Sequence, residues 1–208
     1  MNVCTSAMKR NSDFRTRLIV RLAGPAAEKY ETAPPGWRTV RSREEVIALH
    51  ESAHAVAAFL AGRRLLMLSI IPSLRSLGHV TYGGKSSDAA PETLLDEMMI
   101  FGEPDGISDR RSVLQILAAM PALERRAIHR MFRELEAEVS ELVRTNWKTI
   151  LLLANELVAQ QWIGGRRAEG IISSTLAAQP EAGAWTPPAG LLDWRAALHR
   201  AGTAATFA

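Results

Sequence analysis

The chain contains very little cysteine: among 208 residues, Cys4 is the single one. One thiol cannot form a disulfide within the chain, so the fold does not depend on a disulfide framework. This usage suits a reducing compartment, and we expect a cytoplasmic protein. Long hydrophobic runs are also missing, because no apolar stretch reaches the roughly 18 residues that a membrane-spanning helix needs. We therefore expect no transmembrane span.

Aromatic residues and net charge are modest as well, at 6% of residues and +3. Basic residues gather in the first 45 positions, but no aromatic side chains alternate with them to stack on bases, so we do not expect nucleic acid as a partner. A G-x-x-x-x-G-K-[ST] phosphate loop is absent. The segment closest to one, Gly83-Gly84-Lys85-Ser86, lacks the leading glycine and is predicted to be a turn. An ATPase module of that type is therefore not expected.

The most informative feature that is present is an H-E-x-x-H motif, formed by His50-Glu51-Ser52-Ala53-His54. On a helix, residues four apart share one face, so both imidazoles can point at one ion. Two histidine nitrogens at this spacing suit tetrahedral zinc and leave room for a third protein ligand and a water. Glu51 lies beside that water, where it can act as general base. The motif predicts most of a hydrolytic zinc site.

The surrounding sequence favours a helix for this motif. Ser42 and Glu45 form a capping-box pattern, an apolar stripe follows at helical spacing, and Gly62 ends the segment. Next, Leu65–Pro72 and Leu77–Tyr82 read as two strands, the second closed by Gly83-Gly84. A helix beside a small sheet forms a cleft, in which a strand edge can hold an extended peptide.

We expect the substrate-binding main-chain atoms to come from Ile70 or from His79 and Val80, with the His79 side chain as an additional contact. Further along, Leu123–Phe132 and Glu134–Gln161 are predicted to be helices, the second one ended by Gly164-Gly165. Four arginines, Arg125, Arg126, Arg130 and Arg133, are predicted to form a solvated helix face. The expected fold class is mainly α with a small β-sheet, an α+β fold.

From His50 to Tyr82 the chain resembles the peptidase domain of the FtsH-type AAA zinc proteases. The shared features are the motif helix, a strand ending in Ile70-Ile71-Pro72, and Leu77-Gly78 before the next strand. In that family an aspartate after a Phe-Gly-Glu segment is the third zinc ligand. Here Phe101-Gly102-Glu103 precedes Asp109, so the resemblance implies Asp109 as third ligand. The alternatives that remain open are Asp105, Asp88 and Glu97.

The chain also departs from the family pattern. Ala53 replaces the usual glycine, and the spacing between His54 and Asp109 is shorter than usual. Leu22–Glu28 resembles an Ala-Gly-Arg-Ala-Ala-Glu box that in the family lies between the zinc helix and the aspartate helix. This position indicates a permuted order of elements, and the alternative is a coincidental alanine-rich helix.

We therefore predict three regions: residues 1–42, a basic N-terminal arm with a helical segment; residues 43–175, a zinc metallopeptidase-like domain; and residues 176–208, a tail rich in alanine and proline. The expected function is that of a zinc-dependent, ATP-independent endopeptidase that cuts flexible or unfolded segments. Its partners would be peptide or protein substrates and an ATPase acting in trans. The rival hypotheses are a non-catalytic adaptor or decoy that binds an ATPase–protease complex, and a zinc hydrolase of a non-peptide amide.

Overall fold

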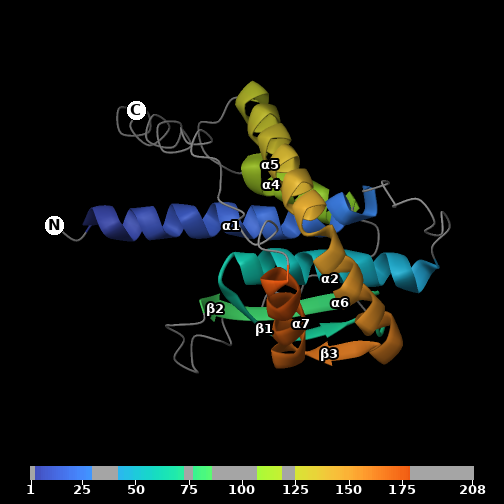
Figure 1. Cartoon of the computed structure of the whole chain (residues 1–208). Helices are drawn as coiled ribbons and strands as arrows, with labels where there is room; N and C mark the ends of the chain where they lie inside the picture. The colour runs from blue at the N-terminus through green and yellow to red at the C-terminus, as the bar shows by residue number, and fades with distance from the viewer. Residues whose placement is uncertain (1–2, 30–41, 73–76, 86–106, 119–124, 179–208) are drawn as a thin grey trace, which may run out of the picture.

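The computed structural model describes residues 3–29, 42–72, 77–85, 107–118 and 125–178. Within them the chain is mainly helical with one small sheet, which confirms the predicted α+β class (Figure 1). The elements in chain order are α1 (Val3–Lys29), α2 (Arg43–Leu60), β1 (Arg63–Ser69), β2 (His79–Lys85), α4 (Ile107–Ala118), α5 (Arg125–Thr145), α6 (Trp147–Gln160), β3 (Trp162–Gly164) and α7 (Gly165–Ala177). Three residues named as alternative ligands, Asp88, Glu97 and Asp105, lie outside the described residues, as does the predicted tail from residue 179 onward.

Helix α2 carries the H-E-x-x-H motif and begins as its sequence predicts. The Ser42 hydroxyl accepts from the backbone N–H of Glu45 at 3.2 Å, and the Glu45 carboxylate accepts from the Ser42 N–H at 2.7 Å. These bonds satisfy donors that would otherwise have no partner in the first turn. The helix ends before Gly62, whose φ of 73° lies in the left-handed region that favours glycine. α2 packs against α1, α6 and β1, so it is the central element of the fold.

The sheet is antiparallel with the order β2-β1-β3, so β1 is its central strand. Leu68 of β1 pairs with Val80 of β2 on one side and with Ile163 of β3 on the other. The prediction of a turn at Gly83-Gly84 was wrong, because β2 continues through both glycines to Lys85. The β1–β2 register is irregular over the same stretch, where glycine accommodates uneven pairing. β3 was not predicted, because a strand of three residues is too short to show an alternation of apolar and polar residues.

The C-terminal helices differ from the prediction in where they break. α5 is continuous past Phe132 and Glu134, and the break comes instead at Asn146, which lies between α5 and α6. The Asn146 side-chain amide donates to the Leu142 carbonyl at 2.8 Å, so it satisfies a carbonyl at the end of α5. Gly164-Gly165 does not end α6 either. Gln161, with a φ of 63°, is the left-handed residue that caps it.

Helix α1 belongs to the hydrophobic core, although its sequence lies in the predicted N-terminal arm. It packs against α2, α4 and α5. Its buried apolar side chains are Leu18, Ile19, Val20, Leu22, Ala23 and Ala27. An ion pair between Arg15 and the buried carboxylate of Glu138 links it to α5. The side of α2 that carries the motif is therefore covered by the N-terminal helix of the same chain.

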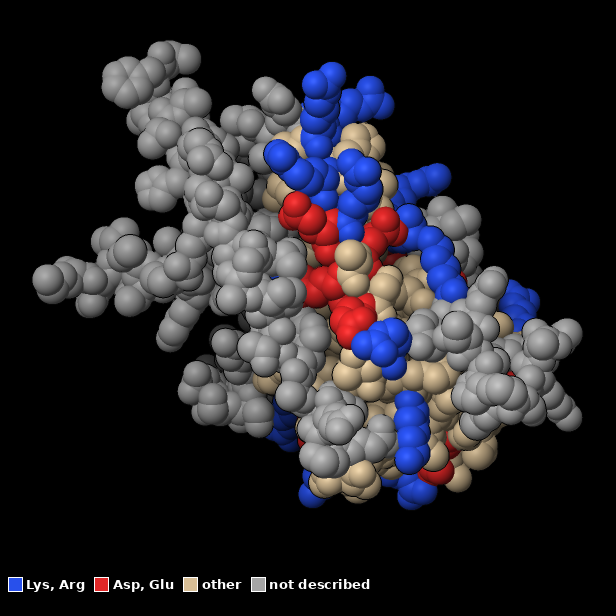
Figure 2. Space-filling view, turned by 45° about the horizontal axis from the view of Figure 1, so that its top comes forward, with Lys and Arg blue, Asp and Glu red and all other residues tan. Residues whose placement is uncertain are grey.

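The predicted solvated arginine face is confirmed, since Arg125, Arg126, Arg130 and Arg133 of α5 are all exposed. Figure 2 shows basic side chains gathered at the top of the molecule, the end from which α5 projects in Figure 1, above a group of acidic side chains. None of the helices in the described part of the chain combines the length and the hydrophobicity that are needed to cross a membrane.

Candidate metal centre

Two helices bring the three predicted ligands together. On α2, the Nε2 atoms of His50 and His54 lie 2.9 Å apart. In the first turn of α4, Asp109 places its Oδ2 atom 3.3 Å from the His50 Nε2 and 3.2 Å from the His54 Nε2. All three residues are buried, with exposed fractions of 4%, 0% and 6% in the order His50, His54, Asp109. This buried group can hold a metal ion.

The other ring nitrogen of each histidine fixes its tautomer. His54 Nδ1 lies 2.6 Å from the carbonyl oxygen of Val20, and a carbonyl only accepts, so this Nδ1 carries a proton and donates it. His50 Nδ1 lies 2.6 Å from the Glu28 carboxylate, to which it donates in the same way. In the neutral rings both Nε2 atoms are therefore lone-pair acceptors. They face each other and a carboxylate oxygen, an arrangement that is repulsive unless a cation or an additional proton lies between them.

The pKa values of His50 and Asp109 also indicate that the site favours a positive charge. Burial lowers the pKa of His50, but hydrogen bonds to Asp109 and Glu28 and the charge on Glu51 outweigh it and raise that pKa to about 10. Burial opposes ionisation of Asp109, but its contact with His50 and His54 holds its pKa well below its usual range. A positive charge is therefore favoured at the point where the three ligand atoms meet.

The spacing of the ligand atoms is compatible with a bound metal ion. Ligand atoms about 2.0–2.1 Å from a tetrahedral zinc lie roughly 3.3 Å from one another. The observed separations are 2.9, 3.2 and 3.3 Å. Gly24 of α1 faces the histidines, and a Cβ atom at this position would lie 2.6 Å from both Nε2 atoms. The absence of a side chain at residue 24 therefore leaves room for both rings in these positions.

Glu51 lies next to the ligands in the same buried environment and is 3% exposed. Its Oε2 atom has no hydrogen-bond partner within the described part of the chain. Burial raises the pKa of Glu51 to about 8; the charge on His50 lowers it, and the charges on Asp109 and Glu28 raise it further. A buried carboxylate oxygen without a partner is suited to accept a proton from a reacting water.

The predicted substrate contacts separate into two groups. Gly78 lies against Glu51, since a Cβ atom there would be 2.8 Å from Glu51 Oε1, and β2 begins at the next residue. His79 and Val80 therefore start a strand beside Glu51, and β2 is an edge strand among the described residues. Ile70 is different, because its N–H donates to the Gln161 carbonyl at 2.9 Å and is not available to a peptide.

Sequence reasoning missed the contribution of α1 to this site. The resemblance of Leu22–Glu28 to a family box indicated this segment, but gave no role to Glu28 or Gly24. The Val20 carbonyl is a backbone atom, so no sequence signal identifies it. All three act on the two histidines from a helix that precedes the motif in the chain.

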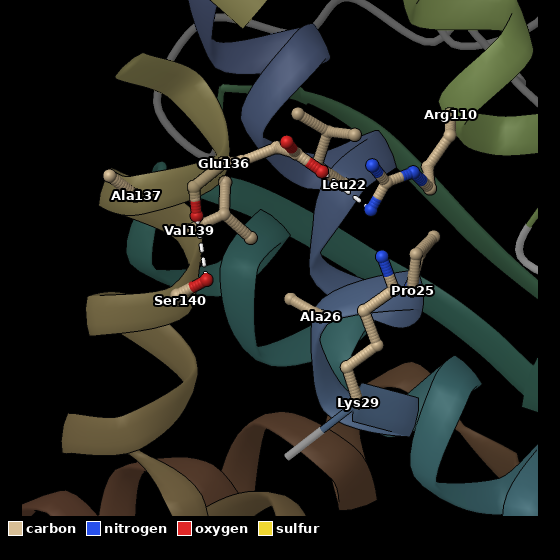
Figure 3. A pocket seen from close by; sticks show the side chains of 9 residues that line it. All are labelled: Leu22, Pro25, Ala26, Lys29, Arg110, Glu136, Ala137, Val139 and Ser140. Carbon is tan, nitrogen blue, oxygen red and sulfur yellow. Dashed lines mark hydrogen bonds and ion pairs between the residues drawn. The ribbon is translucent and has the colours of Figure 1, made fainter. Parts of the chain in front are cut away.

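A cavity of about 300 Å³ lies apart from these ligands, between α1, α4 and α5 (Figure 3). Its lining consists of Leu22, Pro25, Ala26, Lys29, Arg110, Glu136, Ala137, Val139 and Ser140. An ion pair of 2.5 Å joins Arg110 to Glu136 across it. Neither the three ligands nor Glu51 line it.

Comparison with known proteins adds no assignment, because no family model, curated protein or solved structure matches the chain. The chemistry of the site is therefore the basis for the function proposed below.

Proposed function

We propose that this protein is a zinc-dependent metallopeptidase that cuts flexible or unfolded peptide segments without ATP. The observation that carries the proposal is the convergence of His50 Nε2, His54 Nε2 and Asp109 Oδ2 within 3.3 Å, with Glu51 buried beside them. Two imidazoles and one carboxylate form a donor set that zinc prefers in catalytic sites, where a fourth position stays open.

Each residue has a defined role in this proposal. His50, His54 and Asp109 hold the ion. The ion would supply Lewis acidity, which lowers the pKa of a water and polarises a carbonyl oxygen. Glu51 accepts the proton of the attacking water and delivers it to the leaving amine. Its carboxylate is suited to this because its Oε2 atom has no partner among the described residues.

The substrate class follows from the edge strand. A peptide that pairs with β2 near His79 and Val80 has to be extended, and only a flexible or unfolded segment can adopt that conformation without prior unfolding. The sequence contains no phosphate loop, so cleavage would not need ATP. For folded substrates, a separate ATPase acting in trans would have to unfold the segment to be cut. The single cysteine agrees with action in the cytoplasm.

A comparison of wild type with Glu51→Gln tests this proposal. Elemental mass spectrometry on protein purified without chelators should give about one zinc per chain for both. Hydrolysis of casein, an unfolded substrate, should fall about 10²- to 10⁴-fold in the variant, because the proton acceptor is lost while the ligands remain. Glu44→Gln, at an exposed position in the first turn of α2, is the matched control and should cleave as wild type does.

The same assay separates the peptidase from its rivals. If zinc is bound but neither wild type nor Glu51→Gln cleaves casein, the peptidase proposal fails, and a non-catalytic adaptor or a hydrolase of another amide takes its place. Equal cleavage by the two forms would also reject the proposed role of Glu51.

A further inference from the structure

We infer that α1 is a functional part of the metal centre: Gly24 lets the helix backbone approach the two ligand imidazoles closely, and Glu28 and the Val20 carbonyl hold those imidazoles in position. This inference rests on the proposed metal site. It assigns positioning roles to residues that lie 22 and more positions before the motif.

The first support is the contact between Glu28 and His50. The carboxylate accepts from His50 Nδ1 at 2.6 Å, and the side chains are 22% and 5% exposed respectively. A carboxylate on the far nitrogen of a ligand histidine fixes the ring orientation and makes the near nitrogen a stronger donor to a metal. Together, Glu28 and Asp109 also bring two negative charges, which match the charge of a divalent ion.

The second support is the contact between His54 and the backbone of α1. The Val20 carbonyl accepts from His54 Nδ1 at 2.6 Å in a fully buried environment. Val20 and Glu28 are eight residues apart, about two turns, so one face of α1 reaches both histidines. The two rings are thus oriented by a single rigid element.

The third support is the position of Gly24 between these two contacts. The α1 backbone comes so close to the histidines that a Cβ atom on residue 24 would lie 2.6 Å from each Nε2 and 2.7 Å from His50 Cδ2. A methyl group there would push the two rings out of the positions that bring their Nε2 atoms together. Gly170 in α7 provides the contrast, because nothing lies within 4 Å of a Cβ at that position.

The test uses zinc affinity in the full chain, measured by competition with a chromophoric chelator. Glu28→Gln keeps the side-chain shape and removes the charge, and we expect a loss of affinity of about 10- to 100-fold. For Gly24→Ala we expect a loss of at least about tenfold, because the methyl group displaces the ligand rings. The controls are Glu156→Gln, whose carboxylate pairs with an exposed arginine, and Gly170→Ala; both should stay within about twofold of wild type.

Thermal unfolding with and without zinc separates positioning from simple helix–helix packing. If α1 positions the ligands, the rise in Tm on zinc addition should shrink in Glu28→Gln and Gly24→Ala. If Glu28 only ties α1 to α2, Tm should fall equally with and without zinc while the zinc affinity stays unchanged, and that result would overturn the inference. Glu28→Gln decides the matter if Gly24→Ala does not fold.

The readout does not depend on catalysis, so the two proposals can fail separately. If the wild-type protein binds zinc but cleaves no peptide, and Glu28→Gln weakens this zinc binding, the role of α1 is supported and the peptidase proposal is rejected. Wild-type affinity in both variants, or a wild-type protein that binds no zinc, would reject the role of α1.

Discussion

At the scale of single residues, the orientation of the two imidazoles governs the chemistry of the site. The Nδ1 atoms of His50 and His54 each meet an acceptor, so the Nε2 atoms have their lone pairs available. Asp109 brings a third acceptor to the same point, and its pKa is held low by the two histidines that it contacts. Removal of the carboxylate would therefore affect both the donor set and the charge of the site.

We expect Asp109→Ala to lose zinc, with stoichiometry falling from about one to well below one per chain, because two histidines alone form a weak site. The measurement is elemental mass spectrometry after dialysis against metal-free buffer. Arg111→Ala, at an exposed position in the same turn of α4, should retain full occupancy. Wild-type zinc content in Asp109→Ala would identify a different third ligand.

A second residue-scale prediction concerns Tyr82, which is 4% exposed. Burial raises the pKa of this phenol well above its ordinary range, against the lowering effect of the charges on Arg63, Arg21 and Arg17. Because the folded-state pKa is raised, the stability that comes from the neutral phenol is complete below the unfolded value of about 10 and is lost as pH rises beyond it.

Tyr82→Phe keeps the buried ring and removes the ionisable group. We expect the stability of the variant, measured by urea unfolding between about pH 8 and 11, to fall less steeply with pH than that of wild type. Parallel pH profiles for the two proteins would show that Tyr82 ionises equally in the folded and unfolded states.

At the scale of elements, the contact between α7 and β1 depends on a glycine. A Cβ atom on Gly165 would lie 1.9 Å from the Leu65 carbonyl oxygen, a backbone atom that cannot move without shifting the sheet. The next turn of α7 strengthens this approach, since Glu169 accepts from the Leu65 N–H at 2.8 Å. The close packing of helix on sheet thus needs the smallest residue at the start of α7.

We expect Gly165→Ala to destabilise the protein by about 1–3 kcal/mol or more, as overpacking against a fixed backbone does. Gly170→Ala is the control in the same helix. It should be neutral or stabilise by up to about 1 kcal/mol, because alanine favours a helix and space is open there. Urea unfolding of both variants measures the difference, and equal stabilities would show that α7 can shift at little cost.

At the scale of the whole molecule, the candidate metal centre connects helices from distant parts of the chain. α2 gives two ligands, α4 gives the third, and α1 contacts both histidines from the opposite side. Because these helices share one core, an ion bound among them stabilises the folded state relative to an unfolded chain that has no such site.

We therefore expect zinc to raise Tm reversibly. Free zinc at 100 times its Kd contributes about 2.7 kcal/mol, which for a chain of this size corresponds to a rise of roughly 5–11 °C. Differential scanning calorimetry with zinc and with a chelator measures the change. Asp109→Ala should show no zinc-dependent rise, and a rise equal to that of wild type would mean that zinc stabilises the protein from another site.

The sequence alone determined the features that depend on local spacing. The capping box starts α2, the four-residue spacing puts His50 and His54 on one face, and short apolar runs predict β1 and β2, because each of these patterns acts within a few neighbouring residues. The resemblance added Asp109, whose place in the first turn of α4 agrees with the structure.

Only the tertiary structure decided what meets the histidines from outside. The contacts of Glu28 and Val20 with them span 22 and 34 positions, and no local rule couples residues at that distance. β3 is too short for a periodic pattern, and the break at Asn146 falls within a continuous apolar stripe. The packing of α1 across α2 sets these contacts, because burial of both apolar faces in one core is a property of the assembled chain and not of either segment.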